Sequence, residues 1–334
     1  MKTLIFLLLT CVTCECMAQL GGSDGIVSLK KALCKPGIQN KSRSKGLEIS
    51  YTRIGGGPVT NNSNNGFVPS EIEAIEALNF KLKIPIINKP SFKLLVGFKH
   101  QPETIFFDDP SLIKANSVFK DVHAARLKSS GLGIYAMKSI SGTRYSGLQV
   151  KLNANGDYNQ LINFDKQYRD INISWANGYK VSEDFEWGYG VTFSSNFRRT
   201  LALPFLFYNR NFNEKWGIES VFPAFIDMRY NLDEKTIILG GYRFNSNNYS
   251  IDKSRTGFDT PVNYHLNHAE LQFGLSVERQ IAPWVWMNVK GGFQYNLNTR
   301  LESQVPEFDS FEVRPQHAPY FSIGVFVSPP SHMK

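Results

Sequence analysis

The chain has 334 residues, a formal net charge of +8 and four cysteines. Its positive residues are scattered along alternating segments and form no compact basic patch, which argues against nucleic-acid binding. No apolar run after residue 18 approaches the length of a membrane-spanning helix, so a membrane-embedded form must cross the bilayer with strands.

The first eighteen residues have the pattern of a cleaved secretory signal. Lys2 supplies a positive start, residues 4–12 form a short apolar run, and residues 16–18 place small side chains at a cleavage site before Gln19. The run is too short for a membrane anchor, which needs about 20 apolar residues. A lipoprotein signal is the weaker alternative, because a bulky threonine precedes each candidate cysteine. We therefore expect residues 1–18 to be removed.

The segment that follows the signal differs from the rest of the chain. Residues 19–45 are rich in glycine and then basic, with no alternation of apolar and polar residues. We expect a flexible basic periplasmic segment here, and a small plug is the less favoured alternative. Cys34 would be the one cysteine left after cleavage, which excludes an internal disulfide and a cysteine-based metal or redox centre.

Residues 46–327 alternate between apolar and polar side chains almost throughout. From 269 to 277, for example, the odd positions are apolar and the even positions are polar or small, as in a strand with two unlike faces. The runs reach about ten residues, which is longer than the strands of a soluble β-sandwich. The polar face mixes Gly, Gln, Asn, Lys and Glu, as a wet lumen would. The pattern predicts an all-β fold, a transmembrane antiparallel up-and-down β-barrel.

The connections alternate between short turns and long polar loops, as in outer-membrane barrels with short periplasmic turns and longer extracellular loops. We expect about 14 strands, with 12 or 16 as alternatives, because residues 118–130 could hold a further strand and Pro223 separates two short ones. A short C-terminal tail, 328–334, follows the barrel. The expected strands are 46–54, 72–87, 91–101, 122–140, 146–156, 168–181, 185–195, 200–211, 216–222, 224–232, 236–246, 266–281, 285–298 and 317–327.

Four tryptophans lie within a few residues of the short turns. Amphipathic indole rings favour the headgroup level of a membrane, so we interpret these residues as a periplasmic aromatic girdle. Ordinary packing of large aromatics within hairpins is the alternative. The residues are Trp187, Trp216, Trp284 and Trp286.

From about residue 146 onward the chain resembles a family of Bacteroidota outer-membrane β-barrel proteins whose domain has no assigned function. The stretches that carry the resemblance are INISWANGYKVSEDFEWGYGVTFSSNF and RRTLALPFLFYNRNFNEKWGIESVFPAFIDMRYNLDEKTIILGGYRF. The resemblance implies the barrel and the cell outer membrane, and it implies no chemistry. The chain departs from the family at residues 197–200, where a Gly-Arg-Pro-like loop is usual, and at its end, where Phe326 is the candidate for the aromatic residue that the assembly machinery reads.

We find no catalytic constellation, cofactor motif or metal site in the sequence. His265 and His268 are three residues apart, which places two strand side chains on opposite faces and does not favour a shared metal. A membrane hydrolase would need a histidine beside a serine on the outer wall, and no such pair is evident. We therefore do not expect an enzyme, and an outer-membrane hydrolase ranks a distant third among the possible functions.

Charged residues on the polar face are the candidate functional residues. One interpretation is a cross-strand network that fills and stiffens the lumen, with Asp227 close to Arg243. The other is a pore whose excess of cations selects anions. The candidate lumen-facing charges are Lys81, Lys83, Lys93, Lys99, Lys151, Glu186, Glu219, Asp227, Arg229, Arg243, Glu270, Glu278 and Lys290.

Two functions remain open on the sequence alone. The first is a passive channel or a small-solute binding and transport barrel, and the second is a structural or surface-interaction barrel without transport. The expected partners are outer-membrane lipid and, during biogenesis, the barrel assembly machinery; we expect no nucleic acid, and the solute is unknown.

Overall fold

The computed structural model of the chain describes residues 34, 36–60, 70–108, 127–196, 200–252, 263–303, 311–312, 314–315 and 317–328. Several expectations fall on residues that lie outside this description: the signal at 1–18, most of the 19–45 segment, residues 118–126 of the region that could hold a further strand, the departure at 197–199 and most of the C-terminal tail. Among the described residues, no helix is long and apolar enough to cross a membrane.

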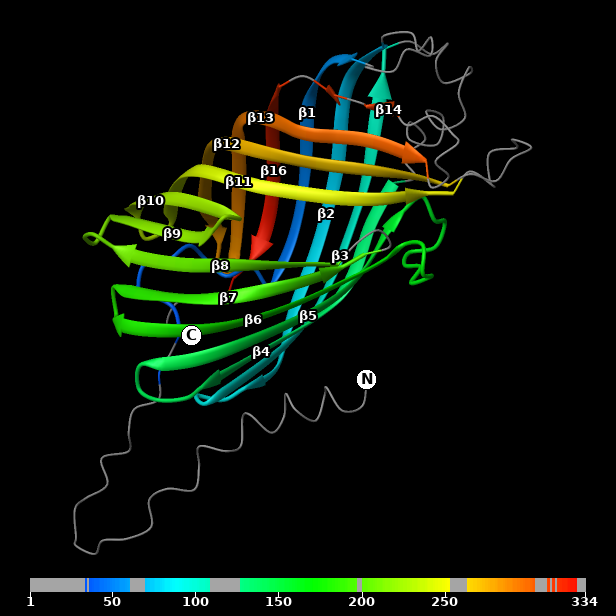
Figure 1. Cartoon of the computed structure of the whole chain (residues 1–334). Helices are drawn as coiled ribbons and strands as arrows, with labels where there is room; N and C mark the ends of the chain where they lie inside the picture. The colour runs from blue at the N-terminus through cyan, green and yellow to red at the C-terminus, as the bar shows by residue number, and fades with distance from the viewer. Residues whose placement is uncertain are drawn as a thin grey trace, which may run out of the picture. The chain divides into compact units, whose positions relative to one another are not determined.

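Fourteen antiparallel strands form a closed barrel (Figure 1). Each pairs with its neighbour in sequence, and the ring closes where β16 lies between β13 and β1. Two short pieces stand outside the ring: β14 (Phe311–Glu312) pairs with β13, and β15 (Arg314–Pro315) pairs with β1. The strands of the ring are β1 Leu47–Thr60, β2 Ser70–Asn88, β3 Phe92–Phe107, β4 Leu127–Ser139, β5 Arg144–Gly156, β6 Arg169–Ser182, β7 Phe185–Ser195, β8 Thr200–Asn211, β9 Trp216–Phe222, β10 Phe225–Asp233, β11 Thr236–Ile251, β12 Tyr264–Ala282, β13 Val285–Ser303 and β16 Ala318–Val327.

The predicted barrel of about 14 strands is confirmed, and β7, β8 and β9 have the predicted bounds. Several other strands run further toward the long loops than the alternation indicated. β3, for example, continues to Phe107 and not to 101. There the inner positions change from polar to apolar, because Ile105 and Phe107 pack against residues of facing strands. The two-faced pattern is lost at that point although the strand continues.

The two faces of the wall follow the predicted alternation. On β12 the side chains of Phe273 and Leu275 are 45% and 65% exposed, whereas Glu270 and Glu278 are buried. The apolar side chains therefore point outward and the polar ones point into the lumen, the reverse of a soluble protein.

Three of the four tryptophans have the exposed position that the predicted girdle requires, and the fourth does not. Trp187, Trp216 and Trp284 are exposed beside the short turns, but Trp286 is buried and stacks on Phe326 with 6.1 Å between ring centroids. Trp284 adopts a positive φ in the turn before β13, so the spacing of two between 284 and 286 does not keep both rings on one face.

The register predicts opposite outcomes for one substitution at adjacent positions of β12. Phe273→Lys would place a cation on the lipid face at a cost of about 2–4 kcal/mol near the membrane midplane. It should sharply reduce the heat-modifiable, folded fraction after refolding into lipid vesicles. Gln272→Lys, whose side chain faces the lumen, should refold like the wild type; equal losses in both variants would mean that the faces are misassigned.

Candidate functional site

Near the long loops, apolar side chains from opposite walls of the barrel pack together in the lumen. The inner faces of β2, β3 and β4 meet those of β11 and β12 in one buried cluster: Ile72, Ile75, Ile105, Phe107, Leu127, Tyr249, Ile251, Tyr264 and Leu266. The end of β11 also pairs with β5 on the opposite wall, at Ser250 and Gly156. Apolar residues in the interior of a barrel have their contacts across the lumen, so this end behaves as a small hydrophobic core.

At the short-turn end, residues 36–45 lie against the inner wall; we call this segment the strap. The Gly37 amide donates to Glu186 Oε2 (2.7 Å) on β7, and the Ser42 amide and hydroxyl donate to the two oxygens of Glu219 (2.8 and 2.6 Å) on β9. Lys45 Nζ lies 3.2 Å from Glu278 on β12. Three buried carboxylates on three strands therefore bind the strap.

Two cations of the strap stand over the buried aromatic pair of the lumen. Arg43 lies 5.2 Å from the ring centroid of Trp286, and Lys45 lies 4.6 Å from that of Phe326. Burial would lower the pKa of the Lys45 ammonium, but the neighbouring Glu278 and Glu48 carboxylates outweigh burial and raise it. Lys45 therefore carries its charge at neutral pH. These contacts were not predicted from the sequence, where 19–45 showed no pattern; the flexible periplasmic character of that segment stays a prediction.

The candidate lumen charges lie on the inner face of the wall, and more than half of those residues have a partner. Arg243 Nη2 lies 3.0 Å from Asp227 Oδ2, as the sequence predicted. Arg229, which is fully buried, lies 3.3 Å from Glu219. Glu186, Glu278 and Glu270 pair with Lys41, Lys45 and His268, and Lys81 lies 3.6 Å from Glu48. This part of the lumen matches the interpretation of a stiffening network.

Other lumen lysines have no carboxylate within 4.0 Å among the described residues. They are Lys83, Lys99, Lys151 and Lys290. Lys93 belongs with them, and it shares the inner face of β3 with Lys99. Lys81 stands directly opposite Lys99 in the register of β2 and β3. Like charges at directly opposed positions destabilise a sheet, so this cluster is unfavourable unless an anion or water compensates it.

A row across four strands brings two of these lysines toward each other. Lys83 aligns with Gly97, Gly133 and then Lys151 across β2, β3, β4 and β5. The ring of Tyr135 occupies the space above the two glycines, where a β-carbon would be crowded, and Lys83 Nζ lies 5.1 Å from its centroid. A negative ring face next to an ammonium partly offsets the missing counter-ion.

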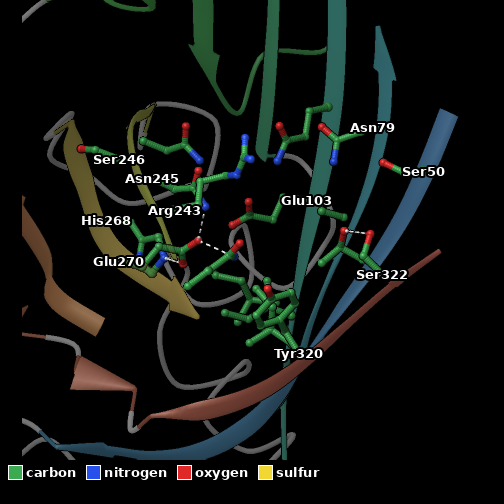
Figure 2. A pocket seen from close by; sticks show the side chains of 18 of the residues that line it. Ser50, Asn79, Glu103, Arg243, Asn245, Ser246, His268, Glu270, Tyr320 and Ser322 are labelled. Carbon is green, nitrogen blue, oxygen red and sulfur yellow. Dashed lines mark hydrogen bonds and ion pairs between the residues drawn. The ribbon is translucent and has the colours of Figure 1, made fainter. Parts of the chain in front are cut away.

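Between the strap and the apolar cluster lies a cavity of about 480 Å³, which we call the chamber. A second cavity of about 320 Å³ adjoins it toward the strap and shares Lys81, Arg243 and Lys290 with it. Figure 2 shows Arg243 and Glu270 on one side of the chamber and Asn79 on the other. The chamber is large enough for a small organic solute.

In the part of the chain that the structure describes, the histidines form no shared site with each other. His265 and His268 both lie on β12, where alternation places them on opposite faces. His268 contacts Thr299 and Glu270 (2.8 and 2.5 Å). Among the described residues, no three His, Cys, Asp or Glu side chains are grouped as a metal site.

One histidine–serine pair exists that the sequence reading missed. His100 Nδ1 lies 2.8 Å from Ser130 Oγ, because the register of β3 and β4 places the two residues directly opposite each other. Their numbers put both on the outward face, the place a membrane hydrolase would need. Ser130 is fully buried, however, so its hydroxyl is closed to a substrate. The pair therefore does not form an active site in this conformation.

Residues 113–328 match the family described as a domain of unknown function, DUF6268. The chain belongs to this family. The match includes the whole stretch from residue 146 that carried the resemblance, and it extends further toward the N-terminus. The bacterial group that the resemblance suggested stays a prediction. Among curated proteins, no significant match is found.

Several solved structures share the barrel architecture at low similarity. An outer membrane channel from Pseudomonas putida F1 is 10% identical over 88% of this chain and 99% of its own, with a TM-score of 0.38. A TodX monoaromatic hydrocarbon channel mutant is 7% identical over 85% and 91%, with a TM-score of 0.41. A Pseudomonas aeruginosa FadL homologue is 8% identical over 84% and 89%, with a TM-score of 0.38. Likenesses this distant carry no solute or mechanism over to this chain.

The contacts of the strap predict a large effect at Glu219. Glu219→Gln would leave the buried Arg229 without its counter-ion and weaken both Ser42 contacts. Because an unpaired buried charge is costly, the free energy of unfolding should fall by about 3–5 kcal/mol, measured by urea titration in vesicles. Glu183→Gln, which breaks an exposed pair with Lys180, should cost about 0–1 kcal/mol; similar losses in both would contradict a buried, strap-bound pair.

Proposed function

We propose that this protein is an outer-membrane barrel that binds small anionic solutes in its chamber and lets them pass. The observation that carries the proposal is the pair Lys99 and Lys290, which line the chamber with no carboxylate within 4.0 Å among the described residues. Unpaired cations in a confined lumen attract anions, as rings of Lys or Arg do in selective pores. Three carboxylates also line the chamber: Glu48 lies beside Lys45 and Lys81, Glu270 lies beside His268, and Glu103 accepts a hydrogen bond from Tyr249.

The outer-membrane assignment is supported by three features that agree. The sequence begins with the pattern of a secretory signal. The barrel is closed and presents an apolar outer face, and its connections alternate between short turns and long loops. A closed barrel with an apolar exterior is one of the two architectures that satisfy their backbone polar groups in lipid.

The packing at the two ends of the lumen favours a gated passage over a wide pore. A solute that leaves the chamber along the barrel axis has to pass the strap at one end or the apolar cluster at the other. The strap is held by hydrogen bonds and ion pairs, which water or a solute can replace, whereas the apolar cluster resists hydration. We therefore assign the movable barrier to the strap.

The second candidate is a structural or surface-interaction barrel without transport. The paired charges on β7, β9, β10 and β12 and the apolar cluster favour it, because both stiffen a lumen and neither conducts. An outer-membrane enzyme is not supported, since Ser130 of the one histidine–serine pair described above is inaccessible.

Reversal potentials across a potassium chloride gradient test the proposal. Wild-type protein in planar bilayers should prefer chloride, and the double variant Lys99→Gln with Lys290→Gln should shift the potential toward potassium. Lys138→Gln, which removes one lysine charge at an exposed position of β4, should leave the potential unchanged. Currents that are absent from correctly folded protein would favour the structural barrel, and an unchanged potential in the double variant would remove the two lysines from the path.

A further inference from the structure

The wall of the barrel is incomplete beside the β9–β10 hairpin. β9 has 7 residues and β10 has 9, whereas the flanking β8 and β11 have 12 and 16. β9 pairs with β8 from Leu206 to Asn211, and β10 pairs with β11 no further than Arg243. Figure 1 shows the hairpin ending well before the loop ends of its neighbours. Among the described residues, the first half of β8 and most of the last half of β11 are therefore paired on one side alone.

The exposure of β8 shows that this gap reaches through the wall. Five consecutive residues, 200–204, are all exposed. In a strand with one face toward lipid and one toward a filled lumen, exposure alternates, as it does on β16. A run of exposed residues means that both faces of β8 are accessible here.

The chamber reaches the free edge of β11 on the other side of the gap. Five consecutive residues of this strand, 243–247, line the chamber, whereas β3 contributes alternate ones such as Lys99, Gln101 and Glu103. Because neighbouring side chains point to opposite faces of a sheet, consecutive residues can line one cavity only where the cavity wraps around an unpaired edge. Figure 2 shows Asn245 and Ser246, one after the other on this edge.

The length of the hairpin places the gap within the membrane. A membrane-spanning strand needs about 9–11 residues, and β9 begins at a short periplasmic turn and has 7. The hairpin therefore ends inside the hydrocarbon layer, on the side of the long loops. Unpaired backbone groups are tolerated at this depth where they line a water-filled cavity, which the chamber provides for β11.

An apolar row leads along the inner face of β8 toward the gap. Leu201, Leu203, Phe205 and Phe207 have the numbering of the buried inner residue Asn209 and so share its face. The rings of Phe205 and Phe207 lie over Gly190 and Gly188 of β7, where a β-carbon would overlap them. The β7 residues that face this row in the register, Gly188, Gly190, Thr192 and Ser194, carry no large apolar side chain, so the row is the apolar part of this stretch of wall.

We infer that the gap between β8 and β11 is a lateral opening through which an anionic amphiphile moves between the lumen and the outer leaflet. The lysines of the chamber bind its head group, and the apolar row of β8 receives its chain. This inference rests on the proposed function for the head group, while the opening itself rests on strand lengths, pairing and exposure. It supplies an exit that requires no movement of the strap or the apolar cluster.

Quenching by brominated lipid tests the opening. A bimane label would be attached at Leu203→Cys, at the outward Leu206→Cys and at the chamber residue Gln272→Cys, each in a Cys34→Ser background. Acyl chains that enter the opening should quench the label at 203 nearly as strongly as at 206 and leave the label at 272 bright. A label at 203 that stays as bright as at 272 would overturn the opening. Leu201→Cys repeats the measurement on the same face if the first variant does not fold.

A second experiment, which measures the binding of two sulfonates, distinguishes failure of the lateral opening from failure of the proposed anion site. Decanesulfonate should shift the emission of bimane at 272 at a concentration about tenfold or more below that of methanesulfonate, because its chain is buried as well. Leu203→Asn should reduce this difference, and Lys99→Gln with Lys290→Gln should weaken both ligands. Failure of both sulfonates to bind, with quenching at 203 intact, would reject the anion assignment and retain the opening. Equal binding of both sulfonates in every variant would mean that the alkyl chain contributes nothing, and this would overturn the inference that the ligand is an amphiphile.

Discussion

The structure depends on pairing the backbone all the way round the sheet. A strand in a membrane has no water with which to satisfy its amide and carbonyl groups, and each unpaired group costs several kcal/mol. The junction of β1, β16 and β13 closes the ring, so that strands from the two ends of the sequence protect each other. All other features of the molecule are arranged inside or against this wall, including the place beside β9 and β10 where the pairing stops.

The closed wall turns many charged side chains into the lumen, and this determines how the interior is arranged. Charged side chains that point inward must find partners, and many do so in pairs such as Glu219 with Arg229. The strap, which lies inside the barrel and is not one of its strands, supplies further partners to Glu186, Glu219 and Glu278. Lys83, Lys99, Lys151 and Lys290 have no carboxylate within 4.0 Å among the described residues. A fold that pairs most of its buried charges and leaves several lysines without a close carboxylate offers a site for an anion.

The wall could be predicted from the sequence because its information is local. Apolar and polar residues alternate with a period of two, and this pattern indicates which residues face the lumen. Turn residues indicate where β7, β8 and β9 begin and end. The same alternation placed the candidate charges on one face and brought Asp227 to Arg243, since both strands leave one short turn.

Contacts across the lumen could not be predicted, because they join residues far apart in the chain and produce no periodic pattern in the sequence. The strap joins Ser42 to Glu219, 177 residues later, and nothing in a basic, pattern-free segment indicates such a partner. The apolar cluster brings Ile72 of β2 together with Ile251 of β11, two strands that do not pair with each other. His100 and Ser130 meet through the β3–β4 register, which could have been found once both strands were drawn and their register was fixed.

The central claim is that the unpaired lysines form an anion site in the chamber. Crystals soaked in bromide test it most directly, because anomalous scattering locates bound bromide without reference to transport. We expect anomalous peaks inside the barrel beside Lys99 and Lys290, weakened in the double glutamine variant. Bromide found only on the outer surface of a well-ordered barrel, with the chamber holding none, would contradict it.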